Sequence, residues 1–205
     1  MSTAFPECRT DLEHLGFRVD GAWLPPIAYT SYLPREEVYR EVAHAGIHLY
    51  CFPAYLAGRG INIHSGIGPF RKGIWPGEGT CDFSDIASDL DLILVADPQA
   101  RVIMRIHLDV PEWWEAAYPG ECCRRRDGSH LRQSFSSLRW LESVSGVLRE
   151  LIAWFRERDY AQHLIGIHLA AGGTEEWIYH FREQFEDRST ARSEHFRSFL
   201  ARTYG

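Results

Sequence analysis

The chain has 205 residues, of which 45% are hydrophobic and 24% are charged, a balance typical of one soluble globular domain and not of a disordered or fibrous protein. The formal net charge is −6 and most basic residues stand alone in the sequence, so no nucleic-acid partner is expected. Because no apolar run approaches the roughly 18 residues of a membrane helix and the N-terminus lacks a signal-peptide pattern, we expect a cytoplasmic protein with no membrane partner.

Short apolar strands alternate with amphipathic helices from about Pro26 onward, after an N-terminal lead-in with a β-hairpin over residues 1–25. In chain order we expect a strand over 25–32, a helix over 34–46, a strand over 47–52, a helix from about 82 to 97, a strand over 101–108, a helix from about 137 to 155, a strand over 163–170 and a last helix from about 190. The residues expected to face inward are Leu141, Val144, Leu148, Leu151, Ile152 and Phe155 on the third helix and Phe196, Phe199 and Leu200 on the last.

The alternation of strand and helix is the sequence form of βαβ units and predicts a parallel sheet. Four such units over residues 26–205 indicate an α/β fold of the (β/α)8 TIM-barrel type, of which this chain holds the first four units, a half barrel. In such barrels the catalytic groups lie in the loops at the C-terminal ends of the strands. The two long connections, residues 53–83 and 109–135, both follow strands and therefore belong to that face.

The strand over 101–108 carries polar side chains on one of its two faces. Alternation places Arg105 and His107 on the face that points into a barrel, with Val102 and Met104 on the other face. Buried cations are costly unless paired, so we interpret Arg105 and His107 as substrate-binding residues. The alternative is that they only neutralise an internal carboxylate without touching a ligand.

The fourth strand, residues 163–170, leads into the sequence HLAAGGTEEW. Alternation turns His168 inward, and Glu175 and Glu176 stand just beyond the strand end, where catalytic groups lie in barrels of this type. A carboxylic acid beside Trp177 can be partly desolvated, which keeps it protonated and able to donate to a leaving oxygen. The alternative is that these glutamates merely begin a helix.

Four tryptophans fall in connections that follow strands: Trp75, Trp113, Trp114 and Trp177. A sugar ring presents an apolar CH face that packs on a flat indole, so a group of tryptophans on one rim indicates a carbohydrate cleft. The alternative for each of them is packing within its own loop.

Three segments, FRVDGAWLPPIAYTSY, RIHLDVPEWW and HLAAGGTEEW, together resemble the N-terminal half of the catalytic barrel of β-galactosidase-like glycoside hydrolases, near family 42 in the clan of retaining (β/α)8 glycosidases. The resemblance covers about residues 17–205 and implies hydrolysis of O-glycosidic bonds in β-glycosides, a place in carbohydrate metabolism, and no cofactor or metal. It assigns the acid/base role to the glutamate directly before the tryptophan, Glu176, with Glu175 as the alternative, where many members have Asn. Asp109, at the end of the third strand, is counted with the substrate-binding residues.

The nucleophile of this family, a second glutamate at the end of strand seven, has no counterpart among the four predicted units. A retaining mechanism needs two carboxyl groups about 5–5.5 Å apart that flank one glycosidic bond. Glu175 cannot supply the second one, because adjacent residues would share one face of the sugar, and Asp109 and Glu112 both follow the third strand. We therefore expect a truncated domain that is inactive alone and that self-associates or pairs with the missing barrel half, because its outer strands are exposed.

Two other functions remain open. A half barrel could bind carbohydrate through its tryptophans without catalysing a reaction. A barrel hydrolase could instead use a metal held by His64, His107, Asp109 and His168, although the HxH strand motif common in such enzymes is replaced here by HxD in RIHLD. The five cysteines contain no CxxC pair, so neither a thiolate metal site nor a disulfide framework is expected.

Overall fold

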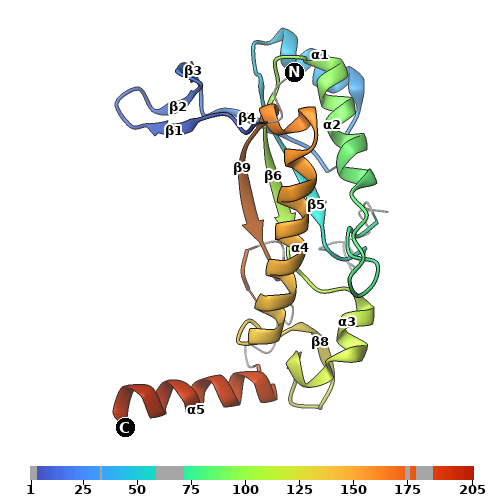
Figure 1. Cartoon of the computed structure of the whole chain (residues 1–205), viewed down its shortest axis with the longest axis vertical. Helices are drawn as coiled ribbons and strands as arrows, with labels where there is room; N and C mark the ends of the chain where they lie inside the picture. Colours follow the sequence, from blue (N-terminus) through green and yellow to red (C-terminus); the bar gives the residue numbers. More distant parts are fainter. Residues whose placement is uncertain (1–3, 33, 59–71, 174–175, 179–186) are drawn as a thin grey trace. The chain divides into compact units, whose positions relative to one another are not determined.

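The structure is a computed structural model that describes residues 4–32, 34–58, 72–173, 176–178 and 187–205 (Figure 1). The chain divides into two compact units. The first comprises Met1–Ala54, Phe83–Ile106 and Glu150–Leu169, and the second comprises Tyr55–Asp82, His107–Arg149 and Ala170–Gly205. Among the described residues, no helix has the length and apolar character needed to cross a membrane.

The N-terminal lead-in of the first unit forms a three-stranded antiparallel sheet where the sequence predicts a hairpin. Its strands are β1 (Cys8–Asp11), β2 (Gly16–Val19) and β3 (Ala22–Leu24), in the order β1-β2-β3. Asp20 and Gly21, between β2 and β3, both have positive φ angles, of 50° and 84°. This backbone suits a tight two-residue hairpin turn, for which Asp-Gly is a favoured pair.

The main sheet of the first unit is parallel, as the alternation of strands and helices predicts. Its strands are β4 (Ala28–Thr30), β5 (Leu49–Tyr55), β6 (Arg101–His107) and β9 (Leu164–Ala170), and they lie in the order β4-β5-β6-β9. Figure 1 shows the arrowheads of β6 and β9 pointing the same way. The described strands form an open sheet, and closure into a barrel is not seen among them.

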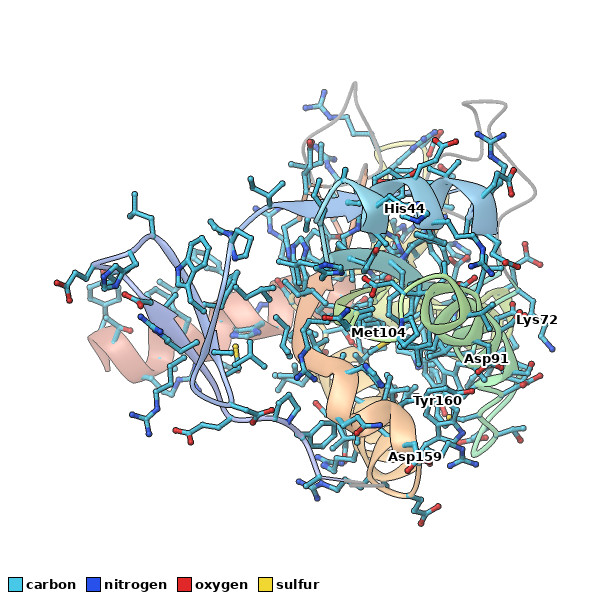
Figure 2. The ribbon with its side chains drawn as sticks, turned by 90° about the horizontal axis from the view of Figure 1, so that it is seen from above. His44, Lys72, Asp91, Met104, Asp159 and Tyr160 are labelled. Atoms are coloured by element: carbon cyan, nitrogen blue, oxygen red, sulfur yellow. The ribbon has the colours of Figure 1, made fainter. Side chains whose placement is uncertain are left out.

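Helices of the first unit follow the strands with the predicted spacing. They are α1 (Glu36–His44), α2 (Ser84–Ala96) and the short η2 (Asp159–His163). Two acidic residues in the first turn of α1, Glu36 and Glu37, suit the positive end of the helix dipole. Figure 2 shows Met104 of β6 among the packed side chains of this unit, and the Tyr160 hydroxyl on η2 donates to Asp91 Oδ1 on α2.

Burial along β6 alternates as expected for a strand with two different faces. Val102, Met104 and Ile106 are fully buried, whereas Arg101, Ile103 and Arg105 are partly exposed. On β9, Gly166 lies on the same face as the second set, since a Cβ atom there would fall 3.8 Å from Ile103 Cγ1. The predicted inward face of the sheet therefore exists, and it is only partly covered in this unit.

The second unit consists of the segments that follow the strands. It holds α3 (Glu112–Ala117), η1 (Pro119–Glu121), the hairpin of β7 (Cys122–Arg124) and β8 (His130–Gln133), and α5 (Thr190–Tyr204). Helix α4 (Leu138–Arg156) begins in this unit and ends in the first. Ser189 caps α5 by accepting a hydrogen bond from the Arg192 N–H.

The predicted face of α4 is confirmed in part, and that of α5 is wrong. On α4, Val144, Leu151 and Phe155 are buried as predicted, together with Trp140 and Val147, while Leu141 is 56% exposed. The inward position goes to Trp140 because its indole N–H donates to the Leu108 carbonyl oxygen. On α5 the residues expected to face inward, Phe196, Phe199 and Leu200, are all exposed, since few described elements pack on that helix.

Candidate functional site

The segments that follow β5, β6 and β9 lie side by side in the second unit. The Leu56 N–H donates to the His107 carbonyl over 3.0 Å, and the Leu108 N–H donates to the Ala170 carbonyl over 2.7 Å. The hydrogen-bond ladder of the parallel strands thus continues past their ends. It places the predicted site residues His107 and Asp109 next to the start of the loop that carries Glu176.

Asp109 is fully buried and is held by several donors. It accepts hydrogen bonds from Arg132 Nη1 (2.6 Å), Gln133 Nε2 (2.6 Å) and the Gly172 N–H (3.0 Å). His107 Nε2 lies 3.7 Å from its Oδ2. The carboxylate predicted to bind substrate is therefore enclosed by protein groups, and its role is to join three loops of the unit.

His107 is also buried, and it acts on the same loop as Asp109. Its Nε2 lies 3.3 Å from the Gly172 carbonyl oxygen, an acceptor, and its ring centroid is 6.0 Å from that of Tyr55. The position of His107 fits the alternative interpretation, in which its side chain is a partner of an internal carboxylate, here that of Asp109. The main cation of this cluster is Arg132, which the sequence analysis missed, because nothing in its neighbours marks it as buried.

Asp109 and His107 both contact the backbone of Gly172. Its φ angle is +81°, and a Cβ atom there would lie 2.1 Å from the Ile178 carbonyl oxygen. Its N–H is bound by Asp109 and its carbonyl by His107. Only glycine fits this conformation and this space, so the start of the loop has one defined path.

The described part of the loop folds back on itself. The Gly173 N–H donates to the Ile178 carbonyl and the Trp177 N–H donates to the Ala171 carbonyl, each over 2.8 Å. These bonds make a turn at Glu176 and not the first turn of a helix, which was the alternative expectation. Glu176 is exposed in this turn, and Glu175 lies outside the described residues.

Trp177 presents an indole to solvent beside Glu176. It has a positive φ of 58°, and 48% of its surface is exposed. Its ring centroid lies 5.8 Å from that of Phe135 and 6.4 Å from that of Trp140, so two further aromatic rings support it from within the unit. Phe135 and Trp140 were not identified from the sequence, although the aromatic residues after β8 could have signalled them.

The other three tryptophans do not form the predicted exposed rim. Trp114 is fully buried and donates to Ser143 Oγ, and Trp75 is also buried. Trp113, which is partly exposed, donates through Nε1 to the Trp75 carbonyl and packs edge-on against its ring with centroids 4.8 Å apart. Trp75 and Trp114 are therefore corrected to packing residues, and Trp177 is the most exposed of the four predicted indoles.

Arg105 and His168 belong to the first unit. The Arg105 guanidinium carbon lies 5.0 Å from the Tyr32 ring centroid, a cation–π contact, and His168 is exposed on β9. His64, of the metal alternative, lies outside the described residues. Within the part of the chain that the structure describes, no group of three or more His, Cys, Asp and Glu side chains could hold a metal ion.

The comparisons with known proteins support the fold. No family model matches the chain, and no curated protein matches it. A solved structure that is similar is the β-galactosidase from the psychrophilic Marinomonas ef1, with a TM-score of 0.57 and 15% sequence identity. The match covers 87% of this chain and 25% of that one, so the chain spans a quarter of the length of the enzyme it resembles. At this identity the similarity shows a shared fold.

Proposed function

We propose that the chain carries the acid/base part of a β-glycosidase site, in which Glu176 is the proton donor and Trp177 is the sugar platform. The observation that supports this most directly is an exposed carboxylate directly beside a half-exposed indole, on a loop set by Gly172. The fold similarity to part of a β-galactosidase agrees with it. Trp113 is the further residue of the same unit that we propose for substrate binding.

The proposed chemistry follows from the two neighbouring groups. The sugar packs its apolar CH face on the Trp177 indole, which brings the glycosidic oxygen to Glu176. Glu176 donates its proton to that oxygen as the bond to the anomeric carbon breaks, so the leaving alcohol departs neutral. A retaining reaction also needs a second carboxylate about 5–5.5 Å from the first. Asp109 cannot supply it, because it is enclosed by its donors.

Non-catalytic carbohydrate binding is the second candidate function. It is favoured by the burial of Asp109, because Glu176 without a second carboxylate at the required distance can bind a hydroxyl but cannot complete the two-carboxylate reaction. Under this alternative Trp177 has the same role and Glu176 only accepts hydrogen bonds from the sugar.

Binding is tested by calorimetric titration with methyl β-galactoside. Trp177→Ala should weaken binding about tenfold, which corresponds to roughly 1.4 kcal/mol, because the stacking surface is lost. Trp23→Ala is the matched control, since Trp23 is 47% exposed, close to the 48% of Trp177, but lies on β3. Equal effects of the two substitutions would contradict the platform.

The acid/base role is tested with two leaving groups. Glu176→Gln removes the proton donor, so it should slow hydrolysis of an alkyl β-galactoside far more than that of a nitrophenyl β-galactoside, whose leaving group departs without protonation. Sugar affinity should stay close to that of the unmodified chain. The assay includes the chain alone and the chain with any partner that completes the site. Equal losses with both substrates would contradict proton donation and favour the binding function.

A further inference from the structure

The second unit contains a cavity of about 470 Å³ at the segment that leads into α5. Its described lining consists of Asp187, Arg188, Arg192, Ser193 and Phe196. Small-molecule sites in proteins commonly measure about 300–1,000 Å³, so the cavity has room for a sugar-sized ligand. Two arginines (+2) and one aspartate (−1) give this described lining a formal charge of +1, whereas the whole chain carries −6.

The carboxylate of the lining is held by uncharged donors. Asp187 is buried, and it accepts hydrogen bonds from the N–H groups of Arg124 and Ser189 and from the hydroxyls of Ser134 and Ser189. None of these donors is a guanidinium group. The Asp187 carboxylate is therefore a fixed part of the wall and forms no ion pair with Arg192.

Arg192 carries a positive charge into the same wall. Its Nη1 donates over 2.7 Å to the Asp187 carbonyl oxygen, an uncharged acceptor, and within the described part of the chain no acidic side chain forms an ion pair with it. A guanidinium has five N–H donors in a planar fork, which matches two oxygens of one anionic group. The remaining donors of Arg192 therefore suit a carboxylate.

An aromatic ring lies beside these polar groups. Phe196 follows Arg192 by one turn of α5 and is 58% exposed, and its ring stacks on that of Phe199 with the centroids 6.5 Å apart. The CH face of a sugar ring packs on an aromatic ring, while its acidic group needs charged or polar donors. The cavity thus offers the two kinds of contact that an acidic sugar makes.

We propose that this cavity binds a hexuronate unit, with the carboxylate on Arg188 and Arg192 and the sugar ring against Phe196. A single negative charge matches the formal charge of +1 of the described lining, whereas a phosphate dianion exceeds it. The Ser193 hydroxyl, which donates to the Ser189 carbonyl oxygen, keeps its lone pairs available to accept from a sugar hydroxyl.

One short segment links the cavity to the Trp177 platform. Ser134 donates its hydroxyl to Asp187, and the next residue, Phe135, has its ring centroid 5.8 Å from that of Trp177. A substrate that uses both places is an acidic glycan, with one unit on Trp177 and a hexuronate in the cavity. This extension rests on the proposed function, whereas hexuronate binding in the cavity does not.

The test is calorimetric titration of the full chain with methyl β-galacturonoside and with methyl β-galactoside, which differ only at C6. The galacturonoside should bind about tenfold more tightly, because its carboxylate accepts charge-assisted hydrogen bonds. Arg192→Gln should remove this preference. The matched control, Arg197→Gln, should keep it, because Arg197 is exposed on α5 but does not belong to the described lining.

Labelling of arginines with phenylglyoxal, followed by peptide mapping, gives a second readout on the unmodified chain. Methyl β-galacturonoside should protect Arg192 and leave Arg197 reactive, and inorganic phosphate at the same concentration should protect neither, since it has no ring to pack on Phe196. Equal affinity for the two glycosides, a preference that survives Arg192→Gln, or equal protection by phosphate would overturn the proposal. Trp177→Ala should leave the protection of Arg192 unchanged, so a failed platform and a failed cavity give different results.

Discussion

Replacing Asp109 by alanine should destabilise the protein more than the substitution of any exposed residue. The change removes the Asp109 carboxylate from the buried Arg132 guanidinium, and it also removes the acceptor of the Gln133 amide and the Gly172 N–H. Removing one partner of a buried ion pair costs about 3–5 kcal/mol. The whole free energy of unfolding of a domain is about 5–15 kcal/mol, so the loss is a large part of it.

The expected shift is measured by calorimetry and by urea denaturation followed by circular dichroism. At roughly 2–4 °C per kcal/mol for a chain of this size, the Tm of Asp109→Ala should fall by roughly 6–20 °C. Glu157→Ala is the control, because that side chain is exposed and its substitution should change stability by no more than about 0.5 kcal/mol.

A double substitution separates the cost of leaving one charge buried without its partner from the other effects of replacing Asp109. Asp109→Leu combined with Arg132→Met removes both charges, so it should be less destabilising than the sum of the two single changes by about 1–3 kcal/mol. The reasoning is refuted if Asp109→Ala lowers stability by less than about 1 kcal/mol or if the single effects simply add.

Three further results are expected. Gly172→Ala should lower stability and weaken sugar binding together, because its Cβ would fall 2.1 Å from a backbone oxygen; unchanged melting and affinity would contradict this. Burial raises the pKa of Cys123 to about 12, so a thiol reagent at pH 8 should label Cys8 well before Cys123 in peptide mapping, and Cys123 only after unfolding. A hydrogen bond from the His14 N–H lowers the pKa of Asp11 to about 2, below the value of about 3.9 in an unfolded chain. The resulting stabilisation is complete above pH 4 and lost as the pH falls to 2, so Asp11→Asn should flatten the acid limb of the stability profile.

Local patterns in the sequence determined the order and type of the elements. The strands over β5, β6 and β9 and the helices between them follow from apolar periodicity, turn residues and helix-end signals, which act within a few residues of one another. Alternation along β6 was likewise predictable, since successive side chains of a strand must point to opposite faces. The position of Glu176 beyond the end of a strand needed no more than this.

Only the tertiary structure decided which of the candidate residues are accessible. Asp109 and Trp114 carry the same chemical groups as an exposed acid and an exposed indole, but long-range partners, Arg132 and Ser143, bury them. At the start of α4, Trp140 and not Leu141 is buried, because its indole N–H donates to the Leu108 carbonyl. Such contacts join residues far apart in the chain, so no local pattern encodes them, and Glu176 and Trp177 remain exposed.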